Sequence, residues 1–245
     1  MSPDTLLEEQ DARRAPGRKR RARAAIWVPL AVFALAAAAA ELGFSRSVTP
    51  GLIAHYERLF GQGARGRLDG WKEFVRSAAV RAPAERGGAA ESDLLRPVNG
   101  FFNRLPYIAD IVHWRIVDYW ATPSEFLGTR GGDCEDFAIA KYFTLKELGV
   151  PVSRLRLVYA RTRKSNVAHM VLAYYSVPGA EPLILDSLEG GIRPASDRPD
   201  LIPVYTFNDD DLLFPQPGVP TIPVSASSFR LWREVLDKLA RELTY

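Results

Sequence analysis

The chain has 245 residues, of which 47% are hydrophobic and 25% charged, so it is long enough to bury the core of one domain and too apolar for disorder throughout. The net charge is +3, but basic residues cluster between Arg13 and Arg23, and the rest of the chain is mildly acidic. This distribution argues against a nucleic-acid-binding protein. The single cysteine excludes an intrachain disulfide, so its thiol is either inert and buried or kept for chemistry.

The first 44 residues have the features of a targeting region. Residues 1–23 are polar and basic, which predicts disorder, and the apolar run from Ala24 to Ala40 carries no charge. Basic residues before an apolar stretch stay on the cytoplasmic side of the membrane. Residues 24–44 therefore predict export, either as a cleaved signal peptide or as a membrane anchor, and the folded domain is expected over residues 45–245.

The first part of this domain is predicted to be helical. Apolar residues at spacings of three and four indicate helices at Leu52–Phe60 and Leu68–Val80, and across Leu94–Trp120 with a break near Pro106. The stretch Arg81–Ser92 is rich in Gly, Ala and Glu and predicts a loop.

A better marked helix follows. Gly131-Gly132-Asp133 provides a flexible loop and an N-cap, and Gly149 and Pro151 end the helix. Apolar side chains cover most of its circumference, as in a helix buried at the centre of a domain. Cys134 is expected at its N-terminus.

After Pro151 the apolar period changes to that of strands. The predicted strands are Leu155–Ala160, Ala168–Tyr175, Pro182–Asp186 and Pro203–Phe207, and an amphipathic helix is predicted at Phe229–Leu243. Helices followed by an antiparallel sheet indicate the α+β class.

Cys134 is the candidate nucleophile. The N-terminus of a helix offers a positive dipole end and unpaired N–H groups, which favour a thiolate and can hold an oxyanion. The alternative interpretation of a lone cysteine is that it is a small buried core residue without a catalytic role. Of the three histidines, His55 and His113 lie in helical segments before the cysteine and are set aside, whereas His169 opens an apolar strand.

The next strand supplies a partner for His169. A four-residue loop, Ser176–Gly179, would place His169 opposite Asp186 on one face of a hairpin, with Cβ atoms about 4.5–5.5 Å apart. A carboxylate there can fix the imidazole tautomer and leave the other ring nitrogen for the thiol of Cys134. A bulge would shift this register.

The residues around Cys134 are acidic. Asp133, Glu135 and Asp136 are like charges that raise the pKa of a thiol. Carboxylates bind Ca²⁺, but they also cap helices and complement the helix dipole, so both interpretations remain open.

The chain resembles the bacterial transglutaminase-like cysteine proteinase family over about Val98 to Phe214. The matching strings are Gly131–Ala138, Ala168–Met170, Leu185–Asp186, Phe101–Asn103 and Pro203–Tyr205. The resemblance implies a papain-like, transglutaminase-like cysteine proteinase fold. It also implies that Cys134 is the nucleophile, His169 the base and Asp186 the residue that orients it, with calcium ligands at Asp133 and Glu135.

The same resemblance implies a periplasmic endopeptidase, either free or anchored in the inner membrane, that cleaves a large repeat adhesin near its N-terminus and so controls biofilm attachment. It implies calcium dependence and sequestration by a cyclic-di-GMP-responsive inner-membrane receptor. Two alternatives remain: a transglutaminase-type acyltransferase with the same three residues, and a non-catalytic calcium-dependent binding module in which Cys134 has no role.

Overall fold

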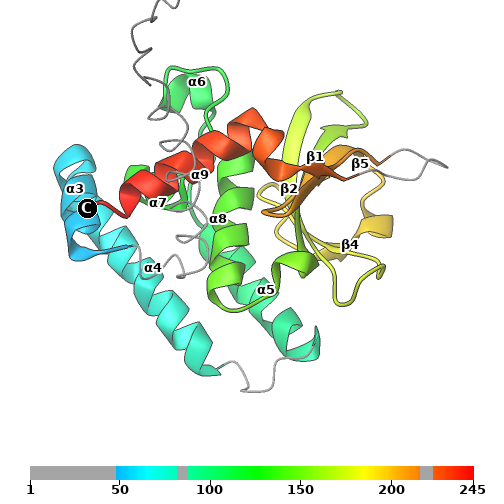
Figure 1. Ribbon diagram of the computed structural model, residues 1–245, viewed down its shortest axis with the longest axis horizontal. Coiled ribbons are helices and arrows are strands. Elements are labelled where there is room, and N and C mark those ends of the chain that lie inside the picture. Colours follow the sequence, from blue (N-terminus) through cyan, green and yellow to red (C-terminus); the bar gives the residue numbers. More distant parts are fainter. Residues whose placement is uncertain (1–47, 82–87, 216–222) are drawn as a thin grey trace, which may run out of the picture.

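The structure is a computed structural model that describes residues 48–81, 88–215 and 223–245. It confirms the α+β class, with helices in the first part of the chain and a sheet in the second (Figure 1). The segments predicted at 1–23 and 24–44 lie outside the described residues. Among the helices that are described, none combines the length and the apolar character needed to cross a membrane.

The helices before the sheet follow the predicted order with one addition, the unpredicted helix at Pro123–Thr129, and two differences. They are α3 (Pro50–Phe60), α4 (Gln62–Arg81), α5 (Gly88–Phe102), α6 (Asp110–His113), α7 (Pro123–Thr129) and α8 (Cys134–Glu147).

The first difference is that the predicted loop is wrong from Gly88 onward, where α5 begins. Residues 82–87 lie outside the described residues. The buried carboxylate of Glu91 anchors this end of the helix, because it binds Arg154 at 2.6 Å and the Tyr174 hydroxyl at 3.0 Å. These partners are distant in sequence, so local composition does not reveal them.

The second difference is that the helix predicted across Leu94–Trp120 is wrong beyond Phe102, apart from the single turn of α6. Arg115 has a φ of 60°, which is incompatible with a continuing helix. The Asp110 carboxylate instead accepts the Tyr119 backbone N–H at 2.5 Å, which closes an irregular loop.

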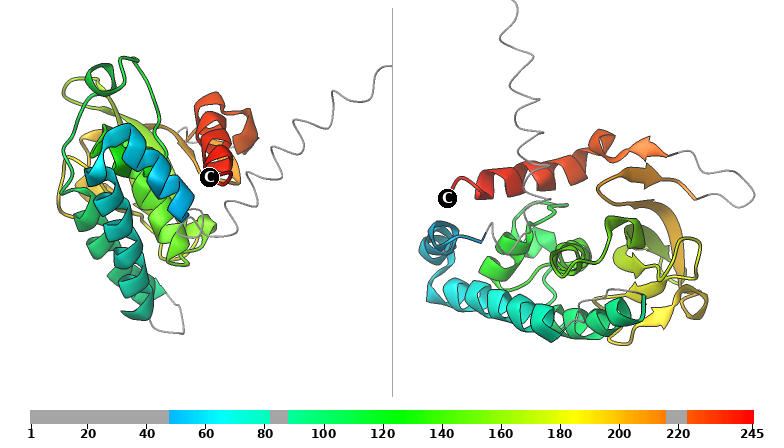
Figure 2. Two further views of the ribbon diagram at one scale, coloured as in Figure 1. Left: turned by 90° about the vertical axis from the view of Figure 1, so that its left-hand side faces the viewer. Right: turned by 60° about the horizontal axis from the view of Figure 1, so that its bottom comes forward.

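Helix α8 runs through the centre of the domain. Twelve of its fourteen residues are buried, as its apolar circumference predicts. Figure 2 shows α4 and α5 on one side of α8, α9 (Arg230–Glu242) on the other, and the sheet beside it. The predicted C-terminal amphipathic helix is thus confirmed as α9.

The sheet is antiparallel throughout, in the order β4-β3-β2-β1-β5-β6-β7. Its strands are β1 (Leu155–Thr162), β2 (Ala168–Tyr174), β3 (Leu183–Leu185), β4 (Arg193–Pro194), β5 (Leu201–Phe207), β6 (Asp211–Leu213) and β7 (Val224–Ser225). The four predicted strands are confirmed. The added strands β4, β6 and β7 have two or three residues, too few for a period-2 signal.

Strands β2 and β3 pair two residues away from the predicted register, since Leu172 pairs with Leu185. The connection is longer than four residues, because the Ala180 N–H is held in a turn by the Val177 carbonyl at 3.1 Å. Asp186 therefore lies just past β3 instead of directly opposite the histidine. A shift by two residues keeps each side chain on the same face of the sheet, so the two can still meet.

The packing of α9 on α8 generates a first prediction. Trp232 is fully buried, and its ring stacks on Phe143 at a centroid distance of 5.7 Å. Trp232→Ala is expected to lower the free energy of unfolding by about 3–5 kcal/mol, because it leaves a large cavity. Urea denaturation followed by circular dichroism measures this change. Arg233→Ala, at an exposed position of the same helix, is the control, and equal effects of the two changes would contradict the packing role of α9.

Candidate active site

Two glycines fix the entry of the chain into α8. The Ile108 N–H donates to the Gly132 carbonyl at 2.8 Å, which holds the preceding loop beside residues 106–108. A Cβ at Gly131 would lie 2.3 Å from the Pro106 carbonyl oxygen, and one at Gly132 would lie 2.0 Å from Oδ2 of Asp136. Only glycine permits these approaches, so the loop that presents the first residue of α8 depends on both.

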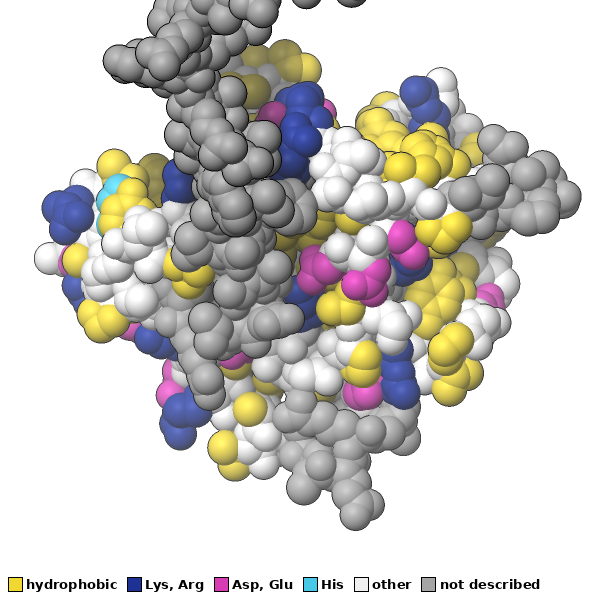
Figure 3. Space-filling model, viewed as in Figure 1, with side chains coloured by type: hydrophobic (Ala, Val, Ile, Leu, Met, Phe, Trp, Pro, Cys, Tyr) yellow, Lys and Arg dark blue, Asp and Glu magenta, His cyan; other side chains and the backbone are white. Residues whose placement is uncertain are grey.

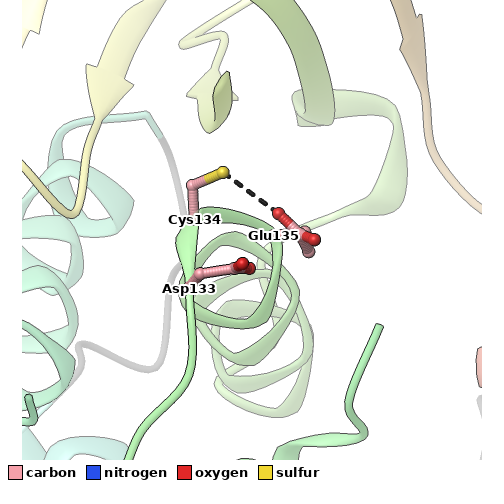
Figure 4. Close-up of side chains that lie close together, drawn as sticks. All are labelled: Asp133, Cys134 and Glu135. Carbon is pink, nitrogen blue, oxygen red and sulfur yellow. Dashed lines mark hydrogen bonds between the residues drawn. The ribbon is translucent and has the colours of Figure 1, made fainter. Parts of the chain in front are cut away.

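The thiol of Cys134 is buried and faces an acidic neighbour. It donates a hydrogen bond to Oε2 of Glu135 at 3.0 Å (Figure 4). Burial raises the pKa of the thiol, and the negative charge of Glu135 raises it further. The backbone N–H of Met170 lowers the pKa of the same thiol. Because Met170 directly follows His169, the start of β2 lies against the sulfur.

His169 and Asp186 form a buried pair. Nε2 of His169 lies 2.8 Å from Oδ1 of Asp186, and the side chains are 4% and 1% exposed. Burial alone would raise the pKa of Asp186, but the bond and charge of His169, the Leu188 N–H and the Arg198 guanidinium together lower it to about 2. Asp186 is therefore a carboxylate that fixes the imidazole through Nε2 and leaves Nδ1 for a second partner.

Asp186 is held from both layers of the domain. Arg198 binds its Oδ2 at 2.8 Å, while Asn103 Nδ2 and Lys141 Nζ donate to its backbone carbonyl at 2.8 and 3.0 Å. Burial lowers the pKa of Lys141 to about 7, against the opposing charge of Asp186. Sequence reasoning gave none of these three residues a role, although Asn103 belongs to a string that carries the family resemblance.

The structure brings two of the three predicted catalytic residues into direct contact. His169 and Asp186 are hydrogen-bonded, whereas Cys134 lies beside Met170 with its thiol on Glu135. Within the described residues, no hydrogen bond joins that thiol to the His169 ring. The complete triad therefore stays a prediction, and Glu135 is the group that holds the sulfur in its place.

The acidic cluster is larger than the sequence suggested. One ligand atom from each of Asp110, Asp118 and Glu135 lies within 4.8 Å of the others, and the same holds for Asp110, Asp133 and Asp136. Asp136 is occupied by backbone N–H groups, including that of Ala121 at 2.7 Å. The predicted ligands Asp133 and Glu135 are thus joined by Asp110 and Asp118. Sequence reasoning missed both residues because it placed them in a continuing helix instead of a folded-back loop.

Two oxygens of this cluster lack partners. Oδ1 of Asp110 and Oδ1 of Asp133 are buried without a hydrogen bond. Burial raises the pKa of Asp110 to about 7, and burial followed by the charge of Asp133 raises that of Glu135. Buried oxygens that lack a donor suit a hard cation with oxygen ligands, so the residues present fit calcium.

Comparisons with known proteins show the family of the chain. The family model described as bacterial transglutaminase-like cysteine proteinase matches residues 76–200. Three similar solved structures are those of Legionella pneumophila LapG. The EGTA-treated form is 39% identical with a TM-score of 0.64, a further LapG structure is 39% identical at 0.62, and the calcium-bound form is 38% identical at 0.61.

The match is nearly complete along the LapG chain. The alignments cover 76% of this chain, and 97%, 97% and 98% of the respective LapG chains. No curated protein matches the chain.

The buried Asp186 carboxylate generates a second prediction. Its pKa is lowered from 3.8 to about 2, so its contribution to folding is present above pH 4 and is lost as the pH falls towards 2. The difference in the free energy of unfolding between the wild type and Asp186→Asn should therefore shrink by about 2 kcal/mol over this window.

Denaturant titrations at several pH values measure this difference. Asp200→Asn is the matched control, because Asp200 also binds Arg198, at 2.9 Å, but is 54% exposed. A pH-independent gap between the wild type and Asp186→Asn would show that the carboxylate does not carry the predicted charge.

Proposed function

The chain belongs to the bacterial transglutaminase-like cysteine proteinase family, and from this premise we propose that Cys134, His169 and Asp186 form the catalytic triad of a periplasmic endopeptidase. The chain is a cysteine protease by family, and Cys134 is its only cysteine. The observation that carries the proposal is the buried His169–Asp186 pair at the start of β2, whose next backbone N–H reaches the Cys134 sulfur.

The proposed reaction follows from the free nitrogen of the imidazole. Nδ1 of His169 takes the thiol proton, and the Cys134 sulfur attacks the peptide carbonyl carbon. The protonated imidazole then gives this proton to the leaving amine, and a water molecule, deprotonated by Nδ1, hydrolyses the thioester. Asp186 stabilises the imidazolium, and unpaired N–H groups at the start of α8 hold the oxyanion.

Calcium is proposed as the resident ion of the acidic cluster. Asp110, Asp118, Asp133 and Glu135 would hold it, and the unpaired Oδ1 atoms of Asp110 and Asp133 support this assignment. When bound, calcium neutralises carboxylates that otherwise favour the protonated thiol. Glu135 then has a competing partner and can release the sulfur towards His169. The calcium-bound form of Legionella pneumophila LapG supports the choice of ion.

A polypeptide substrate suits the surface beside His169. Hydrophobic side chains gather over the β1–β2 end of the sheet on the face seen in Figure 3. Val167 is 58% exposed, and Ile202 and Val204 are 42% and 37% exposed. His169 pairs with Ala160 at this end of β1. An extended chain could therefore cover apolar surface next to the reacting groups.

The physiological substrate is proposed to be a large cell-surface adhesin, cut near its N-terminus so that attachment in a biofilm is controlled. A cyclic-di-GMP-responsive receptor of the inner membrane would sequester the protease. Family membership supports a protein substrate, and the family resemblance implies the adhesin and the receptor. The basic cluster and the uncharged apolar run at the start of the chain support a periplasmic site of action.

The triad generates a third prediction. Cys134→Ala and His169→Gln should each lower the rate of cleavage of an adhesin N-terminal fragment by at least about 10²–10³-fold, because each removes a participant in proton transfer or attack. Mass spectrometry of the two products measures the rate. His55→Gln, on α3, is the control and should retain full activity.

Two results would contradict the proposal. Retained cleavage by Cys134→Ala would remove the sulfur from the reaction. Incorporation of an added amine without cleavage would favour an acyltransferase over a protease.

The acidic cluster generates a fourth prediction. Asp110→Asn should weaken calcium binding about 10-fold or more in isothermal titration calorimetry, because it removes one charged ligand. It should also reduce the calcium-induced rise in melting temperature. Asp210→Asn is the control, because Asp210 is an exposed carboxylate between two further aspartates and outside the cluster. Equal calcium affinities for both variants would place the ion elsewhere.

A further inference from the structure

A pocket in the helical layer contains none of the proposed catalytic residues. Its volume is about 520 Å³, and we call it the arginine pocket. Its lining includes Phe60, Arg67, His113, Trp114, Thr129 and Arg130, which come from α3, α4, α6 and the end of α7.

The pocket carries two positive charges without a counter-charge. Among the residues that the structure describes, neither Arg67 nor Arg130 forms an ion pair. Arg67 is fixed because its guanidinium donates to the backbone carbonyls of Leu127 and Gly128. Burial lowers the pKa of Arg67, and the nearby charge of Arg130 lowers it further. Two cations this close favour an anion between them.

Arg130 holds an unfavourable backbone conformation. It caps α7 with a φ of 75° in the left-handed region, where glycine is favoured over residues that carry a Cβ. The turn itself would be served better by glycine. A role of the Arg130 guanidinium in the pocket would explain why arginine occupies this position, because the turn alone favours glycine.

Two ring nitrogens of the lining also lack partners. Nε1 of Trp114 and Nε2 of His113 are buried without a hydrogen bond. An indole N–H can only donate, so Trp114 requires an acceptor that the described residues do not supply. The indole ring of Trp114 is held in position because it packs on the ring of Tyr119 at a centroid distance of 4.4 Å.

We propose that the arginine pocket binds a carboxylate side chain of an acidic polypeptide segment and acts as an exosite of the protease. A carboxylate accepts from guanidinium groups in bidentate fashion and from an indole N–H. Phe60, which is 40% exposed, offers apolar contact to the rest of the segment. The negative charge of Asp133 acts on His113, and this single charge is outweighed by the two arginines. The polypeptide nature of the ligand rests on the proposed function.

The test uses the full chain and two capped peptides, hexaglutamate and hexaglutamine, in isothermal titration calorimetry with calcium present. Hexaglutamate should bind and hexaglutamine should bind at least about 10-fold more weakly, since the charge-assisted bonds are lost. Arg130→Gly should weaken hexaglutamate binding about 10-fold while keeping or raising the melting temperature, because glycine fits the left-handed cap.

Further variants separate the pocket from general electrostatics. Trp114→Phe keeps the ring and removes the N–H, and should weaken binding several-fold. Arg96→Gln, an exposed change on α5, should leave it unchanged. Equal binding of hexaglutamate to the wild type and Arg130→Gly, or equal binding of the two peptides, would overturn the proposal, as would full displacement of hexaglutamate by equimolar inorganic phosphate.

The outcome is independent of catalysis. Cys134→Ala should bind hexaglutamate like the wild type. If the wild type cleaved no polypeptide, the proposed function would be contradicted, whereas the binding result for the pocket would still hold. With an acidic substrate, Arg130→Gly should raise KM and leave kcat unchanged. An unchanged KM together with active cleavage would contradict the exosite proposal and would leave the proposed protease function intact.

Discussion

The buried carboxylate of Asp186 ties the two layers of the domain together. Its side chain binds His169 on β2 and Arg198, while its backbone carbonyl accepts from Asn103, beside α5, and from Lys141 on α8. A charge buried this deeply requires such partners, since an isolated one would be too costly to fold around. The imidazole is therefore oriented by the packing of helices against the sheet, and not by a flexible loop.

The thiol is governed by an opposing constraint. Helix α8 directs its N–H groups at Cys134, which favours a thiolate, but Glu135 and Asp133 surround it with negative charge. The unpaired oxygens of Asp110 and Asp133 suit a cation that would neutralise this negative charge. The proposed calcium dependence would then follow from electrostatics, because the carboxylates proposed to bind the ion otherwise favour the protonated thiol.

The sequence predicted those features that have a local signal. The buried helix α8 followed from glycines, a cap and an apolar circumference, and His169 stood out as a polar ring opening an apolar strand. The predicted β2–β3 register was wrong by two residues. The alternation of apolar residues marks the strands, but it does not fix the length of the loop that connects them. Arg198 and Asp110 were missed because their roles depend on contacts across the fold, where neither spacing nor composition gives a sign.

The central claim is that His169, held by Asp186, activates the sulfur of Cys134 in the calcium-loaded protein. The most direct measurement is the rate at which iodoacetamide alkylates Cys134, which is unambiguous because the chain has one cysteine. The account predicts rapid alkylation with calcium and a rate at least about 10-fold lower in His169→Gln, since the thiolate loses its base. Equal rates in both proteins would contradict it.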